Sequence, residues 1–223
     1  MSPMLIGLLL DGLKETIFMV GISAGLAALA GVPLGVVLVV TGNGQILQNK
    51  PINRILGAVV NATRSTPFII LLIAIIPVTR LIVGSSIGTA AATVPLTIAA
   101  TPFVARLAES SLREVDAGLV EAAEAMGASP WQIVTKVLLP EAWPGIVAGI
   151  TITVVSLIGY SAMAGAVGGG GLGDLGIRYG YQRFQPEVML AVVVVLIVLV
   201  QAVQSAGDLI ARRLNKKVPR GKA

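Results

Sequence analysis

Residues 121–140 read EAAEAMGASPWQIVTKVLLP and form a charged, helix-forming island in an otherwise apolar chain. Gly127 stands where a first short helix would end, because glycine adopts the left-handed conformation that closes many helices. Ser129 predicts the cap of a second helix, with Pro130 at its first position and Gln132 completing a capping box. The stretch therefore predicts a short helix, a glycine turn and a second helix.

The first of these helices has one apolar face. Its members fall at positions i, i+1, i+4 and i+7, namely Leu119, Val120, Ala123 and Met126. Glu121 and Glu124 lie off that face. A surface helix of this kind can lie in a groove on a partner and transmit rigid-body motion to the segments on either side. The pattern equally fits a hairpin that rests on its own bundle or on lipid headgroups, so geometry alone leaves both interpretations open.

The composition around this island is that of an integral membrane protein. Of the 223 residues, 55% are hydrophobic and 12% are charged, and the mean hydropathy is +0.90. Soluble proteins carry about twice that charged fraction. The chain has no cysteine and no histidine, which removes disulfides, thiolate chemistry and the commonest general base and metal ligand. We expect one membrane domain with no catalytic residue, no metal and no cofactor.

Uncharged stretches predict five transmembrane helices and an all-α fold. A helix needs about 20 apolar residues to cross the hydrocarbon core. Four stretches meet this length, namely residues 17–40, 87–105, 146–167 and 188–206. The fifth, residues 65–79, is uncharged between Arg64 and Arg80, and it spans only if flanking residues join it and an arginine reaches the interface.

The basic residues predict the orientation. An odd number of spans puts the termini on opposite faces, and lysine and arginine favour the cytoplasmic side. With the N-terminus outside, the cytoplasm receives 12 basic residues: Lys50, Arg54, Arg64, Arg106, Arg113, Lys136, Arg212, Arg213, Lys216, Lys217, Arg220 and Lys222. The outside then receives 4: Lys14, Arg80, Arg178 and Arg183. We therefore expect the N-terminus outside, and the C-terminus and the loop of residues 121–140 in the cytoplasm.

The two ends and the long loop complete the predicted organisation. Residues 1–14 have no basic leader and no small-residue cleavage site, so we expect a short interfacial helix and not a cleaved signal peptide. Residues 15–207 form the transmembrane domain, with a solvated, charged loop at about residues 106–141. Residues 208–223 form a basic tail, which is typical of a topology anchor that touches anionic lipid and not of a nucleic-acid-binding segment.

Glycines recur at two kinds of spacing. Three pairs have the small-xxx-small spacing that lets helix backbones approach closely: Gly21 and Gly25, Gly31 and Gly35, and Gly145 and Gly149. They indicate packing within the chain or, for one of them, a subunit interface. Residues 171–176 spell GxGxxG, but no predicted strand precedes them, which argues against a dinucleotide-binding loop. The chain has no GxxxxGK[ST], so it cannot bind ATP by that route. We expect a flexible external loop there, or an element that docks or gates against a partner.

A few polar and adaptable side chains interrupt the aliphatic spans. Tyr160, Ser161 and Met163 lie late in the fourth span, and Asn61 lies just before the second. One interpretation places them on a substrate path, with the thioether of Met163 as a soft gate or substrate contact. The alternative is plain helix packing.

The loop resembles the cytoplasmic coupling loop of type I ABC importer permeases. The shared pattern is E-A-A, three residues, G, nine residues, then an aliphatic residue, any residue, L and P, with Val137 where that family usually has isoleucine. Three longer stretches are similar to methionine ABC transporter permeases: RSTPFIILLIAIIPVTRLIVG (64–84), SIGTAAATVPLTIAATPFVAR (86–106) and GYSAMAGAVGGGGLGDLGIRYGY (159–181). The likeness covers roughly residues 10 to 210.

This resemblance implies a fold, partners and a mechanism. It implies a homodimer of five-helix subunits in the bacterial inner membrane, with the path for L- and possibly D-methionine between them. Two separate ABC ATPase subunits would bind the cytoplasmic loops, and a periplasmic, often lipid-anchored, methionine-binding protein would deliver the substrate. The chain itself would not be an enzyme. By residue, the coupling role carries over to Glu121, Ala122, Ala123, Gly127, Leu139 and Pro140.

Three other functions remain open from the residues. The first is a permease of the same architecture for another amino acid. The second is an ATP-independent channel or secondary transporter, which usually needs an intramembrane ionisable residue or an inverted repeat. The third is a membrane scaffold that only anchors a soluble partner.

Overall fold

The computed structural model describes residues 3–215, and within that range it is helical, with no β-strand. Four helices are long and apolar enough to cross a membrane. They are α1 (Pro3–Val40), α5 (Thr89–Arg113), α8 (Leu139–Ala166) and α10 (Pro186–Leu214). A bent pair, α2 (Lys50–Ser65) and α3 (Phe68–Ala74), can make a fifth span. The all-α prediction is confirmed.

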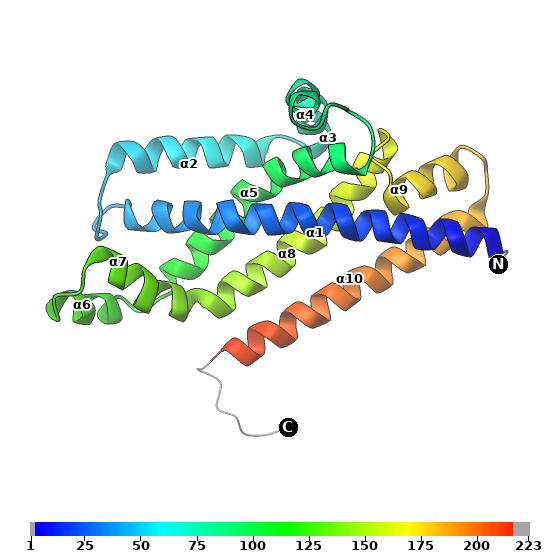
Figure 1. Ribbon diagram of the computed structural model, residues 1–223. Helices are drawn as coiled ribbons and strands as arrows, with labels where there is room; N and C mark the ends of the chain where they lie inside the picture. The colour runs from blue at the N-terminus through cyan, green and yellow to red at the C-terminus, as the bar shows by residue number, and fades with distance from the viewer. Residues whose placement is uncertain (1–2, 216–223) are drawn as a thin grey trace.

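Shorter elements connect these helices. After α3 comes α4 (Ile76–Val83), and after α5 come α6 (Ala117–Ala125), α7 (Pro130–Ile133) and the π-helical turn η1 (Val134–Leu138), which runs directly into α8. Between α8 and α10 lie α9 (Gly171–Leu175) and a second π-helical turn, η2 (Gly176–Tyr181). In Figure 1, α6 and α7 lie at the same end of the bundle as the start of α2, and α9 lies at the opposite end, near the start of α1.

The bundle is organised around α1, whose 38 residues give it a length of about 57 Å. Figure 1 shows α5 and α8 crossing obliquely behind it. The crossing with α5 is close because Gly31 and Gly35 face that helix: a Cβ atom on either would lie 2.7 Å from a backbone oxygen, that of Thr101 or Ala105. Both glycines therefore pack within the chain, as small-xxx-small pairs commonly do.

The other two glycine pairs have different surroundings: one packs against α5 and the other faces no neighbouring atom. Gly145 and Gly149 pack against Ser111 and Leu107 of α5, so this pair also serves packing within the chain. No heavy atom lies within 4 Å of a Cβ built on Gly21 or Gly25, whose face of α1 is open in the isolated chain.

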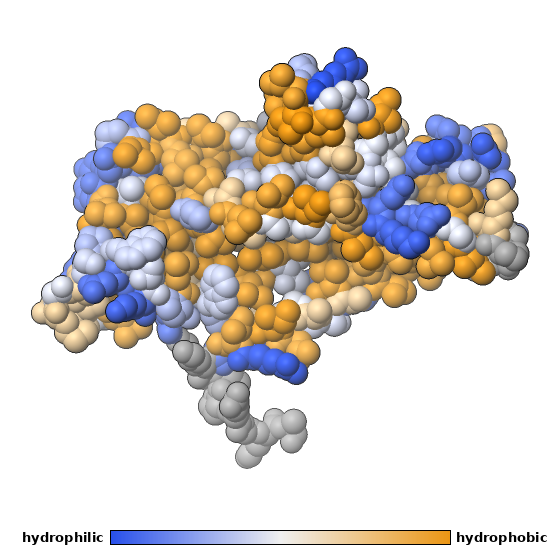
Figure 2. Space-filling view, in the orientation of Figure 1, coloured by the Kyte–Doolittle hydropathy of each residue, from blue (hydrophilic) through white to orange (hydrophobic). Residues whose placement is uncertain are grey.

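The main core lies where α1, α3, α5 and α8 meet. Its fully buried members include Met19, Leu96 and Leu157, each at 0% exposure. Much apolar surface remains outside the core: Ile55 on α2 and Leu29 on α1 are 67% and 76% exposed. Figure 2 shows hydrophobic residues over most of the middle of the molecule, with hydrophilic residues gathered mainly toward the two ends of the long helices. This is the surface expected of a protein whose solvent is lipid.

The predicted spans are recovered within α1, α5, α8 and α10, but the second span was placed wrongly. Residues 65–79 are not one helix, because the chain breaks at Thr66 and Pro67 and again at Ile75. Pro67 cannot continue α2 and precedes the first residue of α3, and Pro77 lies in the first turn of α4. The axis turns by 104° between α2 and α3, so the apolar pair 50–65 and 68–74 replaces the predicted stretch.

The ends of the chain also differ from the predicted division. Residues 3–14 are the first turns of α1 and not a separate helix, and their place at the membrane interface stays a prediction. Residues 208–214 are the last turns of α10 and not part of a tail. The predicted basic tail residues Lys216, Lys217, Arg220 and Lys222 lie outside the described residues.

Candidate functional site

The α6–α7 hairpin (residues 117–133) is closed by the glycine that the sequence singles out. Gly127 has φ +79°, in the left-handed region. Its N–H donates to the Glu124 carbonyl at 2.9 Å, and the Ala128 N–H donates to the Ala123 carbonyl at 3.0 Å. This pair of bonds is the Schellman closure, which satisfies carbonyls that the end of a helix would otherwise leave free. The prediction that Gly127 ends the first helix in the left-handed conformation is confirmed.

The second half of the hairpin has the predicted capping box. The Gln132 N–H donates to the Ser129 hydroxyl, while the Ser129 N–H donates to Gln132 Oε1 at 2.8 Å. Pro130 takes the first helical position, where a missing N–H has no cost. Two local signals of the sequence thus fix where the hairpin turns and where the second helix begins.

A π-helical turn joins this hairpin to the long helix α8. In η1 the Leu139 N–H donates to the Val134 carbonyl five residues back. Pro140 follows at once and has no N–H to donate. The wider turn therefore lies beside a residue that an ordinary helix would accept poorly, and such turns often mark functional sites. Of the two predicted residues here, Leu139 is half-buried and Pro140 is exposed.

One side of the hairpin is packed firmly on the bundle. A buried cluster joins it to the ends of α1 and α5 and to the start of α8: Val39, Val40, Ala108, Leu112, Ala123, Ile133, Val134, Leu138, Ala142 and Ile146. Ala123 and Ile133 are the hairpin's own buried members, 5% and 1% exposed. Because three helices share this cluster, a force applied to the hairpin reaches all three.

The opposite side of the hairpin is exposed and carries apolar side chains at its tip. Met126 is 81% exposed and Trp131 is 75% exposed, and Glu121 and Ala122 are also exposed. The predicted apolar face of Leu119, Val120, Ala123 and Met126 is divided between the bundle and the exposed side. Ala123 is buried and Val120 half-buried against the bundle, whereas Leu119 is exposed. Met126 is the residue that ends the helix, so it does not continue its face.

A buried ion network lies on α5 next to the hairpin, in the region predicted to be a solvated loop. Residues 106–113 belong to α5, and Glu109 is only 6% exposed. Its carboxylate accepts from Arg106 at 2.5 Å and from Arg113 at 2.9 Å. Arg106 also donates to the Asn61 side-chain oxygen at 2.9 Å and to the Gly57 carbonyl at 3.3 Å, which ties α2 to α5.

The sequence analysis did not predict this network, although the spacing of its charged residues indicates it. Arg106, Glu109 and Arg113 have the spacing i, i+3 and i+7 that places them on one helical face. Asn61, predicted as a path residue, uses its side-chain oxygen to hold Arg106.

The three predicted path residues of α8 have different surroundings in the single chain. Tyr160 faces α3, where its ring stacks on Phe68 with centroids 4.7 Å apart. Ser161 is buried, and its hydroxyl donates to the Ile158 carbonyl of its own helix. Met163, three residues after Tyr160, is 48% exposed. Tyr160 and Met163 have the i, i+3 spacing of one helical face, whereas Ser161 is buried.

The segment with the GxGxxG spacing is packed and not a loose loop. Leu172 and Leu175 of α9 are 0% and 5% exposed. The Gly171 N–H donates to the Glu15 carboxylate at 2.6 Å, and the Leu172 N–H donates to the Thr16 hydroxyl at 2.9 Å, so α1 caps the start of α9. A Cβ on Gly173 would lie 2.5 Å from the Ala162 carbonyl oxygen. The expectation of a flexible loop is therefore corrected: these glycines permit close packing.

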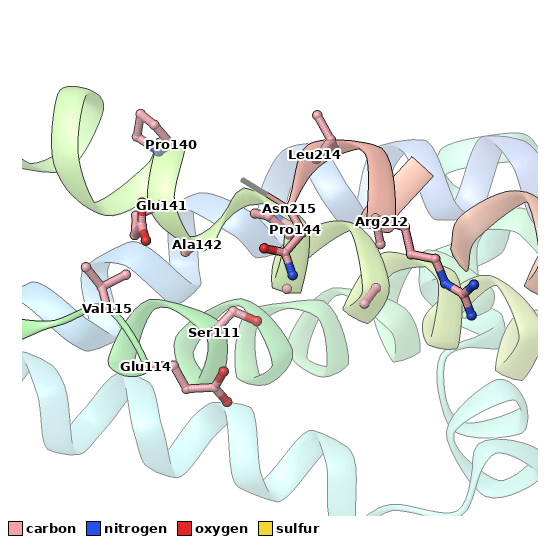
Figure 3. Close-up of a pocket in the computed structure, with 13 residues that line it drawn as sticks. Ser111, Glu114, Val115, Pro140, Glu141, Ala142, Pro144, Arg212, Leu214 and Asn215 are labelled. Carbon is pink, nitrogen blue, oxygen red and sulfur yellow. The ribbon is translucent and has the colours of Figure 1, made fainter. Parts of the chain in front are cut away.

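A pocket of about 390 Å³ lies behind the hairpin, where α5 ends, α8 begins and α10 ends (Figure 3). Its labelled polar side chains come from all three helices: Ser111, Glu114, Glu141, Arg212 and Asn215. The carboxylates at its rim are too few and too scattered to bind a metal ion, and the described residues 3–215 contain no group of three possible metal ligands.

The fold and this site define a class: a multi-pass helical membrane protein with a hairpin at one end that is anchored on three helices and exposes an apolar tip. The sequence matches the family described as "Binding-protein-dependent transport system inner membrane component" over residues 31–218. The chain belongs to this family. It is thus a multi-pass protein of the inner membrane and a component of a transport system.

Individual relatives agree with the family match. The chain is 58% identical over 210 residues to the "Probable D-methionine transport system permease protein MetI" of Vibrio cholerae, covering 94% of this chain and 93% of the relative. It is 53% identical over 165 residues to the D-methionine transport system permease protein of Escherichia coli K12, covering 74% and 76%.

Solved structures show the same fold. A structure titled "Inward facing conformations of the MetNI methionine ABC transporter" aligns with a TM-score of 0.95 and 52% identity, covering 97% of this chain and all of that one. A second, an amino acid ABC transporter with histidines, aligns with a TM-score of 0.77 at 20% identity, a likeness of fold alone. The chain therefore has the type I ABC importer permease fold.

Proposed function

We propose that the chain is the permease subunit of an ATP-binding cassette importer for methionine, in the L and possibly the D form. The observation that carries the proposal is the pair of close relatives named for this substrate: a permease at 58% identity and a transporter structure at 52% identity with a TM-score of 0.95. A permease of this architecture for another amino acid is less well supported, because the relative with another amino acid is only 20% identical.

In this proposal the α6–α7 hairpin is the contact with a separate ATPase subunit. Glu121, Ala122 and Gly127 lie on the exposed side, next to the apolar side chains of Met126 and Trp131. Aromatic and methionine side chains of this kind are enriched where proteins bind each other. Ala123 serves the anchoring side, because it is buried in the cluster shared with α1 and α5. Leu139 and Pro140 serve as the joint between the hairpin and α8.

The proposed assembly has two copies of this chain, two ATPase subunits and a periplasmic methionine-binding protein. The hairpin then lies in the cytoplasm and the start of α1 outside, as the distribution of basic residues favours. ATP hydrolysis occurs on the partner chain, and residues 15–207 form the transmembrane domain. The exposed apolar face of α2 and the open glycine face of α1 offer surface for the second copy and for lipid.

The proposed path lies between the two copies, with Tyr160, Ser161, Met163 and Asn61 near it. Met163 is the strongest candidate for a path residue, because it is exposed in the single chain and its thioether can gate the path or contact a substrate. Met163→Ala is expected to change methionine uptake or the basal ATPase rate of the complete transporter. A variant that leaves both at wild-type values would remove Met163 from the path.

Co-purification from the native membrane tests the proposal as a whole. The chain is tagged, extracted gently, crosslinked lightly, and its companions are identified by mass spectrometry. We expect an ABC ATPase and a binding protein whose bound ligand is methionine. A binding protein that carries another amino acid would favour the alternative, a permease of this architecture for that amino acid. A chain that emerges alone would favour the channel or scaffold functions.

A further inference from the structure

A basic pocket lies where α1 passes into α2, at the same end of the bundle as the α6–α7 hairpin (Figure 1). Its volume is about 140 Å³, roughly ten times the space that one water molecule needs. The residues that line it are Thr41, Asn43, Lys50, Asn53 and Arg54, so two cations and no carboxylate face the pocket. This α1–α2 pocket therefore has the charge of a site for an anion.

Hydrogen bonds across the connecting loop hold the pocket in shape. The Asn53 side-chain amide donates to the Leu38 carbonyl at 2.7 Å and to the Thr41 hydroxyl at 3.1 Å, which ties the first turn of α2 to the end of α1. The Asn49 N–H donates to the Thr41 carbonyl at 2.9 Å. The two cations are therefore carried on a loop and a helical turn that are fixed to each other.

The protein does not balance the positive charge of the pocket. Lys50 and Arg54 are neighbours one helical turn apart on α2. Among the described residues 3–215, no carboxylate forms a salt bridge with either of them. The Arg113 guanidinium lies close by, 3.7 Å from a Cβ built on Gly42 of the same loop, and it shares the Glu109 carboxylate with a second arginine. A ligand in the pocket thus meets an excess of positive charge.

Exposed apolar side chains begin at the same turn of α2. Ile52, Ile55 and Val59 have the i, i+3 and i+7 spacing of one helical face, and all three are exposed. Leu47, in the loop just before α2, is exposed as well. These side chains belong to or adjoin the bent pair of helices that can span the membrane. A ligand of the pocket can therefore set an anionic head against the cations and apolar chains along α2.

This arrangement favours an anionic phospholipid over other anions. A free phosphate ion would use the cations but leave the apolar face of α2 bare. An acidic surface of a soluble protein would have to lie against Ile55 and Val59, which are more favourably covered by hydrocarbon. Basic residues beside a membrane span are attracted to anionic lipids of the cytoplasmic leaflet, and basic pockets between transmembrane helices bind phosphate head groups.

We propose that the α1–α2 pocket binds the phosphodiester head group of an anionic phospholipid, with Lys50 and Arg54 on the phosphate and the acyl chains along the apolar face of α2. The inference goes beyond the proposed transport function and rests on it only for placing this end of the bundle at the cytoplasmic leaflet. The bound lipid would bridge the end of α1 and the start of α2, so it should stabilise this end of the molecule.

The first test counts lipids bound to the complete transporter in detergent by native mass spectrometry, with phosphatidylglycerol as the probe and phosphatidylcholine as the zwitterionic comparison. Lys50→Gln and Arg54→Gln should each weaken phosphatidylglycerol binding about fivefold, the effect of one basic residue near an anionic membrane surface. Arg54→Lys should keep most of the binding, because it keeps the charge. Arg80→Gln removes an exposed cation of α4 outside the pocket and should bind like wild type.

A second test locates the lipid without any variant. Phosphatidylglycerol with a photoreactive head group is mixed with phosphatidylcholine in vesicles that contain the complete wild-type transporter. We expect labels in residues 41–54, and their loss when excess unlabelled phosphatidylglycerol competes. Inorganic phosphate at the same concentration should leave the labels in place, since it lacks the acyl chains.

Three results would overturn the lipid site. One is an Arg54→Gln variant that binds phosphatidylglycerol as Arg80→Gln does. Another is labelling of residues 41–54 that inorganic phosphate abolishes, which would identify a small-anion site. The third is labelling of the ATPase with none in residues 41–54, which would assign the pocket to a protein contact. A transporter that binds the lipid as expected but takes up no methionine would overturn the proposed function and leave the lipid site standing.

Discussion

The α6–α7 hairpin and the α9–η2 segment (residues 171–181) are built alike but differ in which apolar side chains they expose. Both join two long helices, both turn at glycines with positive φ, and both lie next to or contain a π-helical turn. Met126 and Trp131 of the hairpin are exposed, whereas Leu172 and Leu175 of the α9–η2 segment are buried. The glycines alone therefore do not distinguish a segment with an exposed apolar tip from a packed one; the exposure of the apolar side chains does.

The difference has a physical cause in what surrounds each segment. Gly165 and Gly173 let α9 come so close to α8 that a Cβ on either would collide with backbone atoms of the other element. No heavy atom lies within 4 Å of a Cβ built on Gly127, so that glycine is needed for its backbone angle and not for space. Four substitutions test this contrast, in order of their expected effect on stability.

Gly173→Val should have the largest effect. Its Cβ would lie 2.5 Å from the Ala162 carbonyl oxygen, which is backbone and cannot rotate away. We expect a loss of about 3 kcal/mol or more, seen as a lower melting temperature and poor recovery of monodisperse protein in detergent. Gly159→Ala, where no heavy atom lies within 4 Å, is the matched control on α8. A Gly173→Val protein that melts like the control would contradict the close packing.

Thr16→Val should have an intermediate effect. It removes the hydroxyl that accepts from the Leu172 N–H at 2.9 Å and leaves a buried donor without a partner, at a cost of about 1–3 kcal/mol. Thr135→Val is the control, because the Thr135 hydroxyl donates to the Trp131 carbonyl of the same helical turn. If thermal unfolding in detergent finds the two variants equally stable, the cap from α1 does not hold α9 in place.

Gly127→Asp should cost little stability and much function. A residue other than glycine at φ +79° costs about 1–2 kcal/mol, and aspartate is among the side chains that tolerate this region. The variant should assemble in the membrane but fail to couple ATP hydrolysis to methionine uptake, because the turn between the two helices that we propose to dock on the ATPase is distorted. Gly127→Asn adds a side chain of similar shape without the charge, so it shows whether the side chain or its charge causes the loss of coupling. Normal uptake by Gly127→Asp would count against the coupling role of the hairpin.

Trp131→Ala should have the smallest effect on stability, within about 0.5 kcal/mol, because the side chain is 75% exposed. It should still reduce the amount of ATPase that co-purifies, since tryptophan often carries much of the energy of an interface. Trp143→Ala removes the only other tryptophan of the chain, which lies on α8, and should leave ATPase binding unchanged. Equal ATPase recovery from both variants would mean that the tip of the hairpin is not the contact.

Local chemistry predicted the parts of the molecule that depend on neighbours in sequence. Four spans follow from uncharged length, and the turn at Gly127 and the capping box at Ser129 follow from residues within five positions of each other. The second span was misplaced because absence of charge does not guarantee a continuous helix: Pro67 and Pro77 divide it.

Contacts between distant segments explain the remaining differences. Glu109 is buried because α5 packs against its neighbours and because two arginines accompany it, and the sequence shows only their spacing. The packing of the GxGxxG segment depends on Gly165 of α8 and on Glu15 of α1, the latter 156 positions from the residue that it caps. The exposure of the predicted path residues on α8 depends on such contacts too, since neighbouring helices decide which side of α8 is open.

The crossing of α1 and α5 has a genetic consequence. Where two side chains collide, a second mutation can shorten one of them and restore the fit. At Gly31 and Gly35 the obstacles include the carbonyl oxygens of Thr101 and Ala105, which every amino acid at those positions would carry. A substitution at either glycine therefore has no simple suppressor at its point of contact. A revertant screen should return the glycine itself, or changes elsewhere that move a whole helix.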